Sequence, residues 1–285
     1  MRRLVVSAAT ALGLMVMPAT SNAAPAGATE DLCEACDTLL DLSLAHPRRA
    51  QDRARDIFRH PAETLSFFRV RPGMTVIDYM PSGGWYTRVL VPYLGKDGRY
   101  IGLNPAAGPG TAPGMAEMIG GLREKFPVEA AKWNLAGAPV EAFNSDQLGE
   151  DRYGTVDRAL IFREIHNLHR MDFLRSELAR LRKLLKDDGL LGIVQHRTKA
   201  DAPAAYTDGN KGYMRQKDVI ALVEANGFEL VATSEINANS KDPANHPNGV
   251  WMLPPNYRSV AEADKPRYTA IGESDRMTLL FRKRP

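Results

Sequence analysis

Short apolar stretches alternate with amphipathic stretches of helical length through most of the chain. The apolar stretches, which we expect to be strands, span 74–79, 99–103, 155–162, 190–195, 228–235 and 277–283. The amphipathic stretches, which we expect to be helices, span 86–94, 171–185 and 216–226. Strands that alternate with helices of this length are typical of a mostly parallel sheet with helices on both faces. The sequence therefore predicts an α/β domain.

The first expected strand ends in an acid that is followed by a turn of small residues. Residues 76–85 read Val-Ile-Asp-Tyr-Met-Pro-Ser-Gly-Gly-Trp, and the next helix is expected to begin at Tyr86. Glycines let a backbone approach a ligand closely, and the start of a helix offers free N–H groups. In an open α/β sheet such a turn lies beyond the carboxyl ends of the strands, where ligands bind. The block therefore predicts a nucleotide-cofactor site, with a purely structural tight turn as the alternative.

This block, with Arg71–Met74 before it, resembles the first motif of class I S-adenosylmethionine-dependent methyltransferases. The resemblance covers roughly 50–235 and the final strand, and Asp187–Leu190 looks like the turn before the fifth strand. The chain is similar to exported, uncharacterised bacterial methyltransferase-like proteins in the blocks Gly83–Tyr86, Phe162–Asn167, Gly212–Arg215, Glu235–Asn239 and Gly249–Pro255. The resemblance implies a Rossmann-like fold over 50–285, with a mostly parallel seven-stranded sheet and helices on both faces.

The resemblance also implies a cofactor, S-adenosylmethionine, and the residues that bind it. These residues are Asp78, Ser82, Gly83, Gly84 and Asn104. Met80 and Ser82 occupy the first two glycine positions of the family motif, and Asn104 replaces the acid that holds both ribose hydroxyls. Replacing that acid removes charge-assisted hydrogen bonds worth on the order of 1 kcal/mol. We expect weaker cofactor binding than in the family, or none.

Polar side chains follow two of the expected buried strands. His166 and Asn167 follow one strand, and His196 and Arg197 follow the next. The resemblance implies that both strand ends lie beside the sulfur of the cofactor, so we expect these four residues to be catalytic. A neutral histidine accepts a proton from a hydroxyl, amine or thiol, while Asn167 and Arg197 orient the methyl acceptor. His166 is the expected base; its alternative role is that of a hydrogen-bonded wall residue.

Two other functions fit the same part of the sequence. His166, His169 and His196, with Glu164 and Asp201 nearby, are residue types that bind divalent metals. The chain carries no recognised metal signature, so we expect no metal. The second alternative is a repurposed, non-catalytic protein that keeps the fold and binds a ligand but has lost the methyl donor. Retention of the donor separates this alternative from a methyltransferase.

The chain begins with a segment typical of exported proteins. Residues 1–23 combine two arginines, an apolar run and small residues at a cleavage position, which predicts a signal peptide and a periplasmic or secreted protein. Residues 24–49 are expected to form an amino-terminal arm in which Cys33 and Cys36 pair locally. We find no later apolar stretch of ~20 residues and expect no stable membrane insertion after cleavage of the signal peptide.

Charge gives no reason to expect a nucleic-acid partner. Without the two arginines of the leader, the 37 basic residues fall to 35 against 34 acidic residues, a net charge of +1. The expected partner is a small-molecule methyl acceptor, and the sequence does not indicate an oligomeric state.

A long Pro- and Asn-rich stretch, 236–275, connects the last two expected strands. Connections of this length inside a compact domain usually carry function or are disordered. Because the stretch contains Trp251, Tyr257 and Tyr268, we expect it to form an ordered cover over the pocket.

Overall fold

A single sheet organises the residues that the computed structural model describes, 34–108 and 110–285. Its strands are β1 (Thr75–Tyr79), β2 (Arg99–Asn104), β3 (Val140–Asn144), β4 (Val156–Phe162), β5 (Leu185–His196), β6 (Phe228–Ser234) and β7 (Arg276–Lys283). Their order across the sheet is β3-β2-β1-β4-β5-β7-β6. Neighbouring strands are parallel except at β7, which runs antiparallel to β5 and β6. This topology confirms the predicted seven-stranded, mostly parallel sheet.

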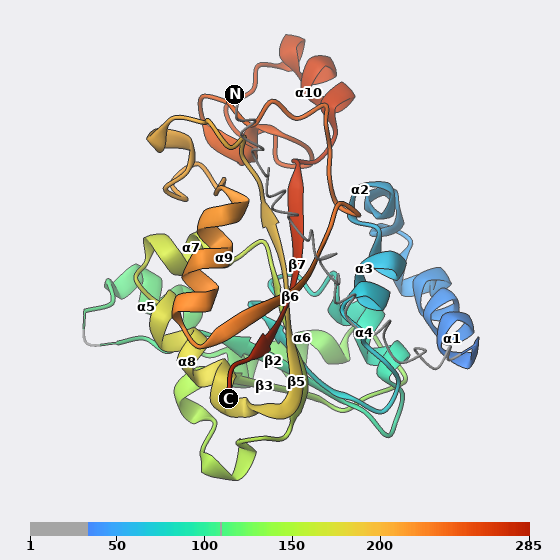
Figure 1. Ribbon diagram of the computed structural model, residues 1–285. Helices are drawn as coiled ribbons and strands as arrows, with labels where there is room; N and C mark the ends of the chain where they lie inside the picture. The colour runs from blue at the N-terminus through green and yellow to red at the C-terminus, as the bar shows by residue number, and fades with distance from the viewer. Residues whose placement is uncertain (1–33, 109) are drawn as a thin grey trace, which may run out of the picture. The chain divides into compact units, whose positions relative to one another are not determined.

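Helices cover both faces of the sheet, as predicted. They are α1 (Glu34–Ala45), α2 (Asp56–Arg59), α3 (Pro61–Phe67), α4 (Thr87–Leu94), α5 (Pro113–Ile119), α6 (Leu122–Ala131), α7 (Ile165–Arg170), α8 (Leu174–Leu184), α9 (Gln216–Ala225) and α10 (Lys265–Ile271). In Figure 1, α1 to α4 lie on one side of the strands and α7 to α9 lie on the other. The pattern of α8 explains its place, because Leu174, Leu178 and Leu181 recur on one helical face and are buried.

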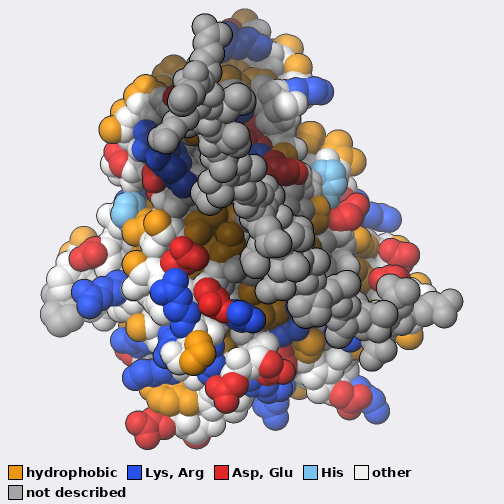
Figure 2. Space-filling model, in the orientation of Figure 1, with side chains coloured by type: hydrophobic (Ala, Val, Ile, Leu, Met, Phe, Trp, Pro, Cys, Tyr) orange, Lys and Arg blue, Asp and Glu red, His pale blue; other side chains and the backbone are white. Residues whose placement is uncertain are grey.

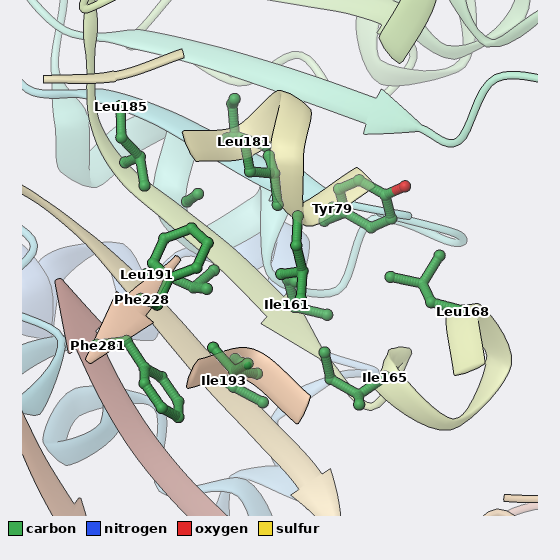
Figure 3. Packing of buried hydrophobic residues seen from close by; sticks show 14 of the residues in the cluster. Tyr79, Ile161, Ile165, Leu168, Leu181, Leu185, Leu191, Ile193, Phe228 and Phe281 are labelled. Carbon is green, nitrogen blue, oxygen red and sulfur yellow. The ribbon is translucent and has the colours of Figure 1, made fainter. Parts of the chain in front are cut away.

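The hydrophobic core has one layer on each face of the sheet. Residues of β1 enter the two layers in alternation: Ile77 and Tyr79 belong to the layer that contains α8, and Val76 belongs to the layer that contains α4. Figure 3 shows the first layer, in which Tyr79, Ile161 and Leu181 pack together. The sheet therefore holds β1, and the turn that follows it, between two buried layers.

The start of β5 differs from the prediction. A turn was expected at 187–189 ahead of the strand, and this was wrong, because β5 already begins at Leu185. Leu185 pairs with Val156, and the next pair joins Leu190 to Arg158, so the residues between them bulge within the strand. Charged and glycine residues therefore mark a bulge here and not a turn.

The compact unit of the described residues begins at Glu34, within the stretch expected to be the arm. α1 packs against α3 and α4, and Cys36 is buried and disulfide-bonded. The expected signal peptide, 1–23, and Cys33 lie outside the described residues. In 34–108 and 110–285, no helix combines the length and the apolar character needed to cross a membrane.

The stretch 236–275 forms a small core of its own with the residues that lead into α9. This core consists of Tyr213, Ala244, Val250, Met252, Leu253 and Tyr268. The Asn237 amide ties the start of the stretch to the domain, because it donates hydrogen bonds to the hydroxyls of Thr64 and Thr278. Asn239 ties the start to the end of the stretch by donating to the Glu273 carbonyl at 2.7 Å.

Candidate active site

The turn after β1 has a left-handed backbone at three alternate residues. Met80, Ser82 and Gly84 have φ angles of 54°, 48° and 71°. This conformation costs a residue other than glycine roughly 1–2 kcal/mol, and such strain clusters at ligand-binding turns. The Met80 side chain packs against the core layer that contains Tyr79, whereas Ser82 and Gly83 are exposed. The turn therefore offers Ser82 and Gly83 to a ligand.

Asp78 precedes this turn and is buried. The Tyr100 hydroxyl donates to Asp78 Oδ2 at 2.8 Å, and the Tyr100 oxygen lies 2.7 Å from the Thr87 hydroxyl at the start of α4. Burial raises the pKa of Asp78 to about 7, although the Tyr100 hydrogen bond and the charge of Arg163 lower it. Asp78 therefore links the end of β1 to β2 and α4, and it supports the turn from within the fold.

The two glycines of the turn have different surroundings. A Cβ at Gly84 would lie 2.0 Å from the Trp133 ring, so packing requires a glycine there. A Cβ at Gly83 would meet no atom of residues 34–108 and 110–285 within 4 Å. Gly83 therefore leaves open space beside the turn, and Gly84 makes room for a tryptophan.

Asn104 lies at the carboxyl end of β2 and is buried. Its Nδ2 donates to the Ile119 carbonyl at 3.0 Å, and Asn144 at the end of β3 donates to the same carbonyl at 2.8 Å. The end of α5 is thereby fixed over the ends of β2 and β3. The Asn104 Oδ1 accepts no hydrogen bond from the described residues, so it is available to a ligand hydroxyl.

A cavity of about 210 Å³ lies at the carboxyl ends of β4 and β5. Its wall includes His166, Asn167 and His196, together with Trp251 from the stretch 236–275. Because β4 is the neighbour of β1 in the sheet, the cavity and the turn 80–84 follow adjacent strands. The structure thus brings three of the four predicted catalytic residues together.

The hydrogen bonds of Gln195 fix the tautomer of His166. Gln195 Nε2 donates to the Gly212 carbonyl at 2.8 Å, which leaves Gln195 Oε1 facing His166 Nδ1 at 3.3 Å. An amide oxygen only accepts, so Nδ1 carries the proton and Nε2 is the unprotonated nitrogen. This Nε2 is screened from solvent and has no hydrogen-bond partner in the described part of the chain. Burial lowers the pKa of His166 to about 4, so the ring is neutral at neutral pH.

His196 and Asn167 line the same cavity from β5 and α7. The His196 ring lies 5.6 Å from the His166 ring, centroid to centroid, and its Nδ1 lies 2.6 Å from the Ser274 hydroxyl. Burial lowers the pKa of His196 well below its ordinary value, so this ring is also neutral. The Asn167 amide donates to Glu164 Oε2 at 2.6 Å. Both side chains are therefore held in fixed positions by neighbours.

Arg197 lies apart from these residues and does not line the cavity. Its guanidinium pairs with Glu235 at 2.6 Å and with Asp275 at 3.0 Å. The hydrogen bonds to Glu235, followed by those to Asp275, raise the pKa of Arg197 above its ordinary value. Successive residues of a strand point to opposite faces, which separates Arg197 from His196. Arg197 thus joins the end of β5 to the ends of the stretch 236–275.

The three histidines of the metal alternative are not grouped. His169 is exposed, whereas His166 and His196 are buried. Within residues 34–108 and 110–285, no group of three or more His, Cys, Asp or Glu side chains is placed to hold a metal ion. The geometry gives the metal alternative no support.

The prediction from sequence missed the charged part of the cavity wall. That part consists of Arg55, Arg163, Glu273 and Arg276. Arg55 donates to Glu273 Oε1 at 2.5 Å across 218 positions of sequence, so only the folded chain brings the two together. For Arg163 a signal existed, since it precedes His166 in the block Phe162–Asn167 on which the resemblance rests.

Comparisons with known proteins bear on the fold. The sequence matches no family model, and no curated protein matches it. Geranyl diphosphate C-methyltransferase from Streptomyces coelicolor A3(2), solved with S-adenosyl-L-homocysteine, is similar in structure, with a TM-score of 0.52 and 10% identity. That match covers 85% of this chain and 87% of the enzyme.

The [4+2]-cyclase SpnF is also similar, with a TM-score of 0.51 and 15% identity over 88% of this chain and 95% of SpnF. At these identities the similarity concerns the fold alone, since one fold hosts different chemistries. Together with the strand order, it shows that this chain has the Rossmann-like fold of class I methyltransferases.

Proposed function

We propose that this protein is an exported S-adenosylmethionine-dependent methyltransferase that acts on a small molecule. Two features together carry the proposal: the turn 80–84, and a cavity with His166 Nε2 in its wall. This Nε2 has no hydrogen-bond partner among the described residues. The two features follow adjacent strands, at the edge where ligands bind in open α/β sheets. The similar Streptomyces enzyme, solved with the demethylated product of the donor, supports the same cofactor here.

The residues at the turn fit S-adenosylmethionine. The exposed Ser82 and Gly83 would contact its methionine part, and Asn104 Oδ1 would accept a hydrogen bond from a ribose hydroxyl. The Met80 side chain, which stands at a glycine position of the family motif, packs against the core. Because Asn104 is uncharged, we expect lower affinity than an acid at this position gives.

The cavity residues account for the acceptor side of the reaction. When bound, S-adenosylmethionine supplies a methyl group that is already electrophilic, so most of the rate comes from positioning the acceptor. His166 Nε2 accepts a hydrogen bond from the hydroxyl, amine or thiol that is methylated. Because the pKa of His166 is about 4, its Nε2 is unprotonated at neutral pH. His166 can therefore orient the nucleophile and accept its proton as the methyl group transfers.

Calorimetric titration with S-adenosylmethionine and S-adenosylhomocysteine tests the proposal. We expect micromolar binding, weakened at least about tenfold by Gly83→Leu, because the leucine fills space beside the turn that no atom of the described residues occupies. His166→Gln is the matched control, since it changes the acceptor cavity and should leave cofactor binding within about twofold. No heat and no thermal shift with either ligand at about 1 mM would exclude the methyltransferase and favour a repurposed binding protein.

The fold by itself does not decide the chemistry. The similarity to a [4+2]-cyclase shows that this fold also supports reactions other than methyl transfer. Figure 2 shows acidic and basic side chains interspersed over the described part of one face, a distribution that suits a small-molecule partner better than a nucleic acid.

Export is the remaining part of the proposal. The leader-like segment 1–23 and the disulfide of Cys36 support it, because disulfides persist in oxidising compartments. We expect deletion of residues 2–23 to retain the protein in the cytoplasm, as measured by cell fractionation of a Gram-negative host. Unchanged distribution after the deletion would contradict export through this segment.

A further inference from the structure

Arginine side chains gather in the wall of the cavity. Arg55, Arg163 and Arg276 line it, and Arg59 joins Arg55 and Arg276 in bonding a single carboxylate, Glu273. Glu273 is 3% exposed, so this is a largely desolvated group of charges. Three guanidinium groups therefore share one counter-charge before Arg163 is considered.

Arg163 is the guanidinium that remains. It makes no hydrogen bond or ion pair with residues 34–108 and 110–285, although it is partly buried. Arg276 and Arg55 lie close enough to repel it, and Glu273, which already bonds three other arginines, lies close enough to attract it. A cation in such surroundings is strongly stabilised by an anion that it can bind through two parallel hydrogen bonds.

The carboxyl groups of the wall offset only part of this charge. Glu273 is already bonded to three arginines, and Glu164 accepts a hydrogen bond from Asn167. Three arginines and two carboxylates thus line the cavity, which leaves its wall with a surplus of one positive charge. This surplus charge faces the cavity. Water and salt screen it less there than they would in bulk solvent.

Apolar side chains form another part of the wall. Trp251, Leu253 and Pro254 line the same cavity, and the Trp251 ring lies 6.1 Å from the His166 ring, centroid to centroid. A flat or apolar molecular body suits such a surface. The wall therefore combines arginines that can bind an anion, apolar side chains and one hydrogen-bond acceptor at His166.

We propose that the cavity binds a small organic anion, with its carboxylate or phosphate group on Arg163 and its apolar body against Trp251. The inference rests on the proposed function in one respect: if the protein is a methyltransferase, the bound anion is its methyl acceptor. With its anionic group on Arg163, a second polar group of the same molecule would meet His166 Nε2.

Binding of simple anions to the purified full chain, without any cofactor, tests this inference. The probes are benzoate and phenyl phosphate, with benzamide as the uncharged analogue of benzoate. We expect at least one anion to bind, benzamide to bind at least about tenfold more weakly, and Arg163→Gln to weaken anion binding at least about tenfold. Arg163→Lys should give an intermediate loss, because lysine keeps the charge but not the paired donors.

Arg175→Gln is the matched control, since it removes an exposed arginine on α8 and should change nothing. Arg163→Gln should unfold at about the same temperature as the unmodified protein, because the substitution removes both the repulsion from Arg276 and Arg55 and the attraction to Glu273. Equal anion affinity in Arg163→Gln and the unmodified protein, or no binding of either anion at about 10 mM, would overturn the inference. Since no probe is a methyl donor, failure here is distinct from failure to bind S-adenosylmethionine.

Discussion

Glu273→Gln lowers the free energy of unfolding by about 3–5 kcal/mol, because it leaves buried arginines without their counter-charge. Arg59 and Arg276 are each about as buried as Glu273 itself, and both bond its Oε2. Glutamine keeps the shape of the side chain, but one of its two terminal groups becomes a donor that faces other donors. Chemical denaturation of the two proteins at neutral pH measures the difference.

Glu262→Gln is the matched control, because its carboxylate pairs with Lys265 at the surface, where its side chain is 86% exposed. Surface pairs contribute about 0–1 kcal/mol, so this variant should differ little from the unmodified protein. Similar losses in the two variants would show that Glu273 has no special role in holding the arginines together.

The same carboxylate predicts how stability depends on pH. Burial alone would raise the pKa of Glu273, but Arg276, Arg59, Arg55 and Arg163 outweigh burial and hold this pKa well below the ordinary value of 4.5. A carboxylate with a lowered pKa stabilises the fold above its unfolded pKa and loses that contribution as the pH falls. The loss of stability below about pH 4.5 should therefore be shallower in Glu273→Gln than in the unmodified protein.

The fold was predictable because its signals are local. The apolar strands and the turn after β1 identify the β1–α4–β2 unit from neighbouring residues alone, and the structure confirms the sheet built on it. The segment with β3, α5 and α6 gave no such signal. α6 carries Pro127 inside it and has no single apolar face, so its sequence does not show the helical period.

The candidate site was predictable only where strand ends determine it. His166 follows β4 and His196 ends β5, and because these strands are parallel neighbours, the two rings lie close together. Arg197 is one residue beyond His196, and that single step turns it toward Glu235. The arginine group could not be predicted in this way. Arg55, in the turn before α2, and Arg59, in α2, both bond Glu273 near the end of the stretch 236–275, and no local sequence pattern reveals contacts over this distance in sequence.

A buried aspartate decides whether the stretch 236–275 stays in place over the cavity. Asp242 has no exposed surface and accepts four hydrogen bonds, two at each carboxylate oxygen. The Ala244 N–H and His246 Nε2 lie at Oδ1, at 2.8 and 2.9 Å. The Asp275 N–H and the Tyr213 hydroxyl lie at Oδ2, at 2.9 and 3.0 Å. Asp242 thus connects both ends of the stretch to the segment that precedes α9.

Asp242→Asn should therefore destabilise the protein by about 3–4 kcal/mol and loosen the stretch 236–275 before the sheet. Each carboxylate oxygen faces a backbone N–H, so either orientation of an asparagine amide sets its NH₂ group against a donor that cannot rotate away. Hydrogen exchange should show faster exchange at 236–275 and near Asp275, with β1 and β4 unchanged. Asp264→Asn, exposed at the start of α10 without a capping bond, is the control. If exchange rises equally across the sheet in Asp242→Asn, the stretch and the sheet unfold as one cooperative unit, and the cavity cannot open by release of this stretch alone.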